Sequence, residues 1–149
     1  MQVSEAKEQR LEQLPVFWME QIVRRYRQVA TQALRAEEAG LSVDQWVVLK
    51  QVGENNGCSQ VEIGNSTVKD APTTTRIIDQ LVNKNLISKQ LDPEDRRRYM
   101  VFLTEKGRRL IERLLPVVQA YRQIPLQGIP ETEQQQLLKT LQRMLHNMA

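Results

Sequence analysis

Apolar residues recur along most of the chain at the three- and four-residue spacing of amphipathic helices. The longest stripe predicts a first helix from about Leu11 to Glu38, with Gly40 as its C-terminal cap residue. Capping residues and further stripes predict five more helices, the third of them beginning at Asp70 and the fourth kinked at Pro116. These five helices span residues 43–54, 59–66, 70–84, 105–123 and 131–146.

One stretch departs from the helical pattern and predicts a β-hairpin. Leu86–Leu91 and Tyr99–Leu103 are rich in apolar, β-branched and aromatic residues, and residues 92–98 connect them through a proline and two aspartates. Three consecutive arginines, Arg96, Arg97 and Arg98, lie in this connection. A slim hairpin with a cationic tip is suited to contact a polyanion, of which double-stranded DNA is the obvious candidate.

The helix predicted just before the hairpin separates polar from apolar residues. Its apolar residues face the core of the module, whereas Thr73, Arg76, Gln80 and Asn83 form one polar stripe. Such side chains bond phosphates or base edges in a major groove. A solvated helix face is the simpler interpretation, but the neighbouring arginines favour DNA. The predicted DNA-binding residues are Thr73, Thr74, Thr75, Arg76 and Gln80 on the helix, and Asp95, Arg96, Arg97 and Arg98 in the hairpin, where Asp95 braces Arg97.

The composition limits the other possibilities. The chain has 149 residues, enough for one domain with a core, and its net charge is only +3, so nucleic-acid binding must depend on where the charges lie. The single cysteine, Cys58, excludes an internal disulfide, and Cys58 and His146 are too few for a metal or Cys-His catalytic site. We therefore expect no catalytic residues, metal or cofactor. No signal peptide or membrane span is apparent, so we expect a cytoplasmic protein without a membrane partner.

The two ends of the chain carry more apolar surface than a small central module can cover. We therefore expect a homodimer in which the ends of both chains interlock; the alternative is that they pack only on their own chain. The expected organisation is an N-terminal dimerisation helix at 1–40, a winged helix-turn-helix lobe at 41–104 and C-terminal dimerisation helices at 105–149, within one structural domain. The predicted fold class is mainly α with a small β-hairpin wing.

The central region resembles the MarR family of bacterial transcription factors. The resemblance rests on residues 41–49, 62–64, 73–81 and 84–87, on the wing motif 92–97, and on the run 101–107 that closes the wing. It implies a helical dimer that binds palindromic operators, usually as a repressor, and often releases DNA on binding a lipophilic effector. It places Asp95 and Arg97 at the wing's acid and minor-groove arginine, and residues 73–76 at the major groove. Departures are Asn85 for a common glycine, Pro72 for serine, Thr74 for valine, and the turn at residues 67–69.

Two sensing mechanisms and one other class of function stay open. Trp18, Tyr26 and Trp46 are candidate lining residues of an effector cleft, although aromatic residues at helical spacing are more often plain core. Cys58 is a candidate redox sensor only if its thiol has a lowered pKa and solvent access. The alternative function is a winged-helix protein-interaction module with little specific DNA binding.

Overall fold

The computed structural model describes residues 8–66 and 70–149. Residues 1–7 and 67–69 lie outside the described residues. The first range belongs to the stretch predicted to lack a signal peptide, and the second is the turn predicted before the recognition helix. The described chain is mostly helical with one two-stranded antiparallel hairpin, which confirms the predicted fold class. Its helices and strands are α1 (Pro15–Ala36), α2 (Val43–Glu54), α3 (Gln60–Ser66), α4 (Ala71–Asn83), β1 (Ile87–Leu91), β2 (Tyr99–Leu103), α5 (Glu105–Gln123) and α6 (Glu131–Asn147), with short 3-10 turns at Leu11–Gln13 and Ile124–Leu126.

Side-chain caps determine where the helices of the lobe begin. The Ser42 hydroxyl accepts a hydrogen bond from the Gln45 N–H at 3.1 Å, and the Asp70 carboxylate accepts one from Thr73 at 2.8 Å. Thr104 caps α5 in the same way, accepting from the Gly107 N–H at 3.0 Å. Each cap satisfies an N–H that has no partner within its helix, so these starts are encoded locally, as predicted.

The first helix differs from its prediction at its beginning. Residues 11–13 form a separate 3-10 turn, and α1 begins only at Pro15. Leu14 is extended, with φ −96° and ψ 120°, because a proline disfavours helical geometry in the residue before it. Helix α5 runs without a break through Pro116, and the kink expected there stays a prediction.

The end of α1 also requires a correction. Glu38, with φ 50°, is the left-handed residue that ends the helix, and Gly40 lies beyond it. The Ala39 N–H donates to the Leu34 carbonyl at 3.2 Å, and the Glu38 N–H donates to the Arg35 carbonyl at 3.0 Å. These two bonds form a Schellman cap, which satisfies terminal carbonyls of the helix.

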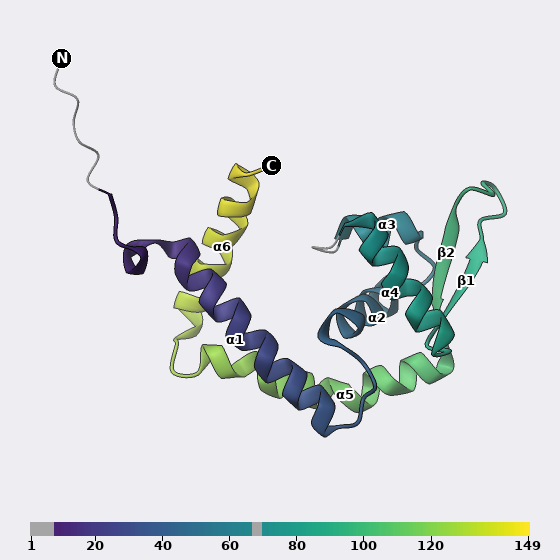
Figure 1. Cartoon of the computed structure of the whole chain (residues 1–149), viewed down its shortest axis with the longest axis horizontal. Coiled ribbons are helices and arrows are strands. Elements are labelled where there is room, and N and C mark those ends of the chain that lie inside the picture. The colour runs from purple at the N-terminus through teal and green to yellow at the C-terminus, as the bar shows by residue number, and fades with distance from the viewer. Residues whose placement is uncertain (1–7, 67–69) are drawn as a thin grey trace, which may run out of the picture.

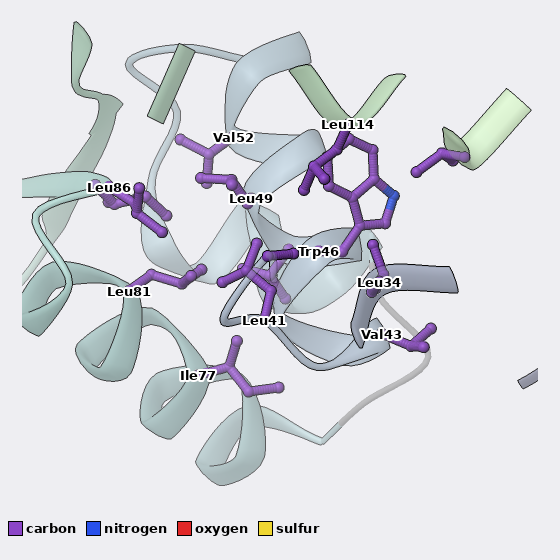
Figure 2. Close-up of a cluster of buried hydrophobic side chains, with 14 of the residues drawn as sticks. Leu34, Leu41, Val43, Trp46, Leu49, Val52, Ile77, Leu81, Leu86 and Leu114 are labelled. Carbon is purple, nitrogen blue, oxygen red and sulfur yellow. The ribbon is translucent and has the colours of Figure 1, made fainter. Parts of the chain in front are cut away.

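The core lies where α2 is surrounded by α1, α4, α5 and the hairpin. Trp46 of α2 is at its centre, with Leu34 of α1 and Leu114 of α5 close by (Figure 2). Leu49 and Leu81 extend the cluster toward α4. The shared core attaches the end of α1 and the first half of α5 firmly to the winged lobe.

The rest of α1 and α5 extends away from the lobe as a two-helix arm. The two helices run side by side, and α6 follows at the far end of the arm (Figure 1). Among the described residues of α6 none is buried, and Leu137, Leu138 and Leu145 are exposed. No helix of the described chain is both long enough and apolar enough to cross a bilayer.

Candidate nucleic-acid interface

Helix α4 presents the predicted polar stripe on the surface of the lobe. Arg76 and Gln80 are exposed, and Thr73 and Thr75 are half-buried. The Gln45 side-chain amide of α2 donates to the side-chain oxygen Oε1 of Gln80 at 2.9 Å. In the same way, the Gln60 amide donates to the Thr75 hydroxyl at 3.0 Å. The neighbouring helices therefore hold Gln80 of the stripe and the nearby Thr75 in defined positions, which reduces the entropy lost when a ligand contacts them.

Thr74 does not belong to this surface. Its side chain is only 1% exposed, and its hydroxyl donates to the Asp70 carbonyl at 3.0 Å. The structure thus corrects the prediction that Thr74 contacts DNA. The reason is angular: successive helical residues are 100° apart, so Thr74, one residue after Thr73, lies well away from the stripe and turns toward the core.

A second feature, which sequence reasoning missed, joins the wing to α4. Lys89 of β1 lies with its ammonium 3.2 Å from an Asp79 carboxylate oxygen, and the same ammonium lies 4.3 Å from the centre of the Tyr99 ring. Asp79 sits beside the polar stripe, where an unpaired carboxylate would repel phosphates. Its pairing with Lys89 reduces that repulsion and connects the two elements of the surface.

The base of the wing is held from both sides. β1 and β2 pair from Ile87–Leu103 to Leu91–Tyr99, and the loop after α2 bonds to the other edge of β2. On that edge the Gly57 N–H donates to the Val101 carbonyl at 2.9 Å, and the Val101 N–H donates to the Cys58 carbonyl at 2.9 Å. Strand β2 is therefore bonded on both edges, like the middle strand of a small sheet. The tip of the hairpin projects beyond the lobe (Figure 1).

Aspartate side chains shape the tip of the wing. Asp92 accepts a hydrogen bond from the Glu94 N–H at 2.9 Å, and Asp95 accepts from the Arg97 N–H at 3.0 Å. The same Asp95 oxygen is 3.2 Å from Nε of Arg97. The backbone and side-chain hydrogen bonds from Arg97 lower the pKa of Asp95, so this carboxylate stays ionised.

This bracing leaves the guanidinium groups available to a ligand. The Arg97 side chain is 90% exposed, and Arg96 and Arg98 are exposed as well. Arg98 lies 3.9 Å from a Glu62 carboxylate oxygen, a separation at which an exposed ion pair contributes little. The structure thus brings together a rigid arginine-tipped hairpin and a polar helix face.

The arm contains a separate apolar pocket of about 310 Å³ between α1 and the end of α5. Trp18 and Tyr26 line it, as does Tyr121, whose ring packs edge-on against Tyr26 with ring centres 5.7 Å apart. Sequence reasoning missed Tyr121 because its partner lies far away in the chain. Trp46 is 1% exposed in the core and is not among the described residues that line the pocket, which corrects its assignment.

Cys58 has the opposite of the environment that a redox sensor needs. Burial and, to a smaller degree, the nearby Glu62 carboxylate raise the pKa of its thiol, so the reactive thiolate is disfavoured. Within residues 8–66 and 70–149, no cluster of three or more histidine, cysteine or acidic side chains is arranged to hold a metal ion.

Comparisons with known proteins connect this geometry to a family. The MarR family model matches residues 41–99. The HTH-type transcriptional repressor IacR of Pseudomonas putida is 30% identical over 139 residues, which cover 93% of this chain and 82% of that protein. The structure of CouR from Rhodococcus jostii RHA1 bound to p-coumaroyl-CoA has a TM-score of 0.81 and 28% identity, covering 92% of this chain and 95% of that one.

A structure of Bordetella bronchiseptica BpsR, whose DNA binding is regulated by 6-hydroxynicotinic acid, has a TM-score of 0.76 and 27% identity, covering 85% of this chain and 95% of that one. The similarity therefore extends beyond the winged lobe to the helical arm. Together with the arginine-tipped wing and the polar face of α4, it shows that this chain belongs to the MarR family of transcriptional regulators.

Proposed function

We propose that the protein is a homodimeric repressor that binds a palindromic operator through α4 and the wing of each lobe. The braced and exposed Arg97 beside the polar face of α4 carries this proposal. The polar stripe suits a major groove, and the arginines suit the adjacent minor groove, where the negative potential is strongest. A protein-interaction module has no need of three exposed arginines at the tip of a rigid hairpin.

An anisotropy titration with the DNA upstream of the protein's own gene tests this proposal. We expect saturable binding that scrambled DNA competes for poorly and that weakens steeply as the salt concentration rises. Equal competition by scrambled DNA would contradict operator recognition and favour the protein-interaction alternative.

The proposed recognition role of α4 predicts the behaviour of an Arg76→Ala variant. Arg76 is exposed on the stripe, so its loss should leave the fold intact and weaken operator binding by roughly 1–3 kcal/mol if it bonds a base edge. Binding of operators changed at single base pairs would show relaxed preference at one position. A uniform loss over all these sequences would instead assign Arg76 to phosphate contacts.

The proposed dimer interface is the apolar surface left open by the arm. Leu145 is 73% exposed and Leu138 is 51% exposed on α6, and Ile22 and Val23 are exposed on α1. Isolated apolar surface of this extent is unfavourable in water, and a second copy of the arm covers it.

Sedimentation of the purified protein should therefore give a dimer at micromolar concentration. A Leu138→Glu, Leu145→Glu variant should shift it toward monomer, because two charges would be buried without partners. Gln136→Glu, on the opposite side of the same helix from Leu138 and Leu145, adds a charge without removing an apolar side chain and should remain dimeric. A wild-type monomer under these conditions would contradict the interface.

The pocket lined by Trp18, Tyr26 and Tyr121 is the proposed effector site. Its walls are largely apolar and aromatic, and two similar proteins, CouR and BpsR, are described with aromatic ligands. The pocket adjoins the exposed apolar surface of α1, so a ligand there contacts the part of the arm that a partner would cover. Such a ligand releases DNA if it binds more tightly to the lobe spacing that does not fit the operator.

Tryptophan fluorescence provides the assay for this site. The chain has two tryptophans, of which Trp46 is buried in the core and Trp18 lines the pocket. We expect an aromatic acid from a broad panel to change the fluorescence of the wild type, and a Trp18→Phe variant to lose that response. Unchanged fluorescence and melting temperature throughout the panel would contradict the assignment.

A further inference from the structure

A basic cleft forms where three segments that are distant in the sequence meet. These are the α1–α2 connection, the turn after α4, and the first half of α5. The cleft has a volume of about 410 Å³, which is within the range of small-molecule sites. Four cationic side chains line it: Lys84, Lys106, Arg109 and Arg113.

Three of these cations are positioned by backbone carbonyl groups. The Lys84 ammonium donates to the Gly40 carbonyl, and the Lys106 ammonium donates to the Lys84 carbonyl at 3.0 Å. The Arg113 guanidinium donates to the Glu37 carbonyl at 3.0 Å. A carbonyl oxygen carries no net charge, so these bonds orient the cations without neutralising them.

Carboxylates neutralise little of the positive charge of the cleft. Arg109 lies 3.3 Å from a Glu105 carboxylate oxygen, but the same carboxylate also pairs with Arg108. Among the residues that the structure describes, no aspartate or glutamate lines the cleft. The cleft therefore has an excess of positive charge that favours an anionic ligand.

Apolar side chains complete the cleft. Leu41 and Leu86 are buried beneath it, and the half-buried Leu110 lies beside them on α5. A site that combines fixed cations with leucine side chains suits a ligand in which anionic groups are attached to an apolar body.

The location separates this cleft from both sites described above. Lys84 follows the C-terminal end of α4, whereas Thr73 lies in its first turn, about 16 Å away at 1.5 Å per helical residue. The effector pocket, in contrast, is lined by residues 18–29 and 121–125 of the arm.

We propose that this cleft binds a small organic polyanion that carries phosphate or carboxylate groups on an apolar body. Arg109 and Lys106 on α5 bind the anionic groups together with Lys84, and the leucines contact the apolar part. Because the ligand touches the α1–α2 connection, the end of α4 and α5 at once, it joins the arm to the winged lobe.

Calorimetric titration of the full-length protein with 1-naphthyl phosphate, in the absence of DNA, tests the proposal. This compound combines a phosphate with an apolar body, whereas inorganic phosphate and 1-naphthol each supply one part alone. We expect one saturable site per chain for 1-naphthyl phosphate, with each partial compound bound at least about tenfold more weakly, since both parts contribute. Absence of saturable binding by the wild type would overturn the proposal.

Two charge-matched variants locate the binding. Arg109→Gln removes a cleft cation that makes no bond to a backbone carbonyl in the described structure, so α5 keeps its anchors to α1 and α4. Arg122→Gln removes an equal charge from the other end of α5. We expect at least about a tenfold loss of 1-naphthyl phosphate affinity in Arg109→Gln and less than about a twofold change in Arg122→Gln.

Circular dichroism and thermal melting first establish that both variants fold. Retained binding in Arg109→Gln would show that the ligand occupies another site, such as the aromatic pocket, and would overturn the assignment. Equal losses in both variants would indicate nonspecific charge attraction and would also overturn it. Because no DNA is present, this result is independent of whether the protein recognises its operator.

Discussion

Replacing Arg96, Arg97 and Arg98 together with alanine is expected to weaken operator binding by roughly 100-fold, or about 3 kcal/mol, on the basis of ~1 kcal/mol per charge-assisted contact. All three side chains are exposed at the tip of the wing and contribute nothing to the core, so the variant should fold normally. The slope of log affinity against log salt should also fall by about one for each arginine that contacts a phosphate.

A matched variant distinguishes the loss of DNA contacts at the wing from the loss of net positive charge. Arg122→Ala, Lys139→Ala and Arg143→Ala together remove the same three charges from α5 and α6, far from the wing. Its operator affinity should change little once sedimentation has shown that it assembles as the wild type does. Arg97→Ala alone should cost at least ~1 kcal/mol, because its braced guanidinium is the best positioned of the three. An unchanged affinity in the triple wing variant would show that the wing does not touch DNA.

Gly107→Ala is expected to reduce the free energy of unfolding by about 3 kcal/mol, the upper part of the range for overpacking a core. A Cβ atom at Gly107 would lie 2.2 Å from the Leu86 carbonyl oxygen and 2.9 Å from a Leu103 methyl carbon. The carbonyl belongs to the backbone just before β1, so relief requires moving α5 away from the base of the wing. Urea denaturation at a fixed protein concentration measures the loss.

Gly64→Ala is the control for the loss of a glycine. Among the described residues, a Cβ atom at Gly64, within α3, would meet only the Thr74 methyl group, at an ordinary contact distance of 3.9 Å. Because alanine favours helix by up to ~1 kcal/mol over glycine, this variant should be as stable as the wild type or more stable. A Gly107→Ala protein with wild-type stability would show that α5 and the wing base tolerate separation.

Much of the secondary structure follows from interactions between residues close in sequence. Ser42, Asp70 and Thr104 each cap a helix through an N–H three residues further along, so these starts were predictable. The wing was predictable as well, because Asp95 and Arg97 bond within the turn itself. The beginning of α1 was missed although its cause, Pro15 acting on Leu14, is also local.

The composition of the candidate sites was less predictable. Thr74 and Trp46 have side chains suited to DNA or ligand contact, yet both are buried by neighbouring helices. Conversely, Tyr121 lines the apolar pocket of the arm from a helix about 95 residues after Tyr26, a contact that no periodic pattern indicates.

The amino-acid pattern by itself determined the helices of the lobe, the arginine-tipped hairpin and the surplus of apolar surface at both ends, because periodicity, caps and turns act over a few residues. Only the tertiary structure decided that Lys89 pairs with Asp79, that Gln45 and Gln60 hold Gln80 and Thr75, and that four cations gather in one cleft. Those arrangements depend on the packing of α2, α4 and α5 around Trp46, which joins residues far apart in the chain.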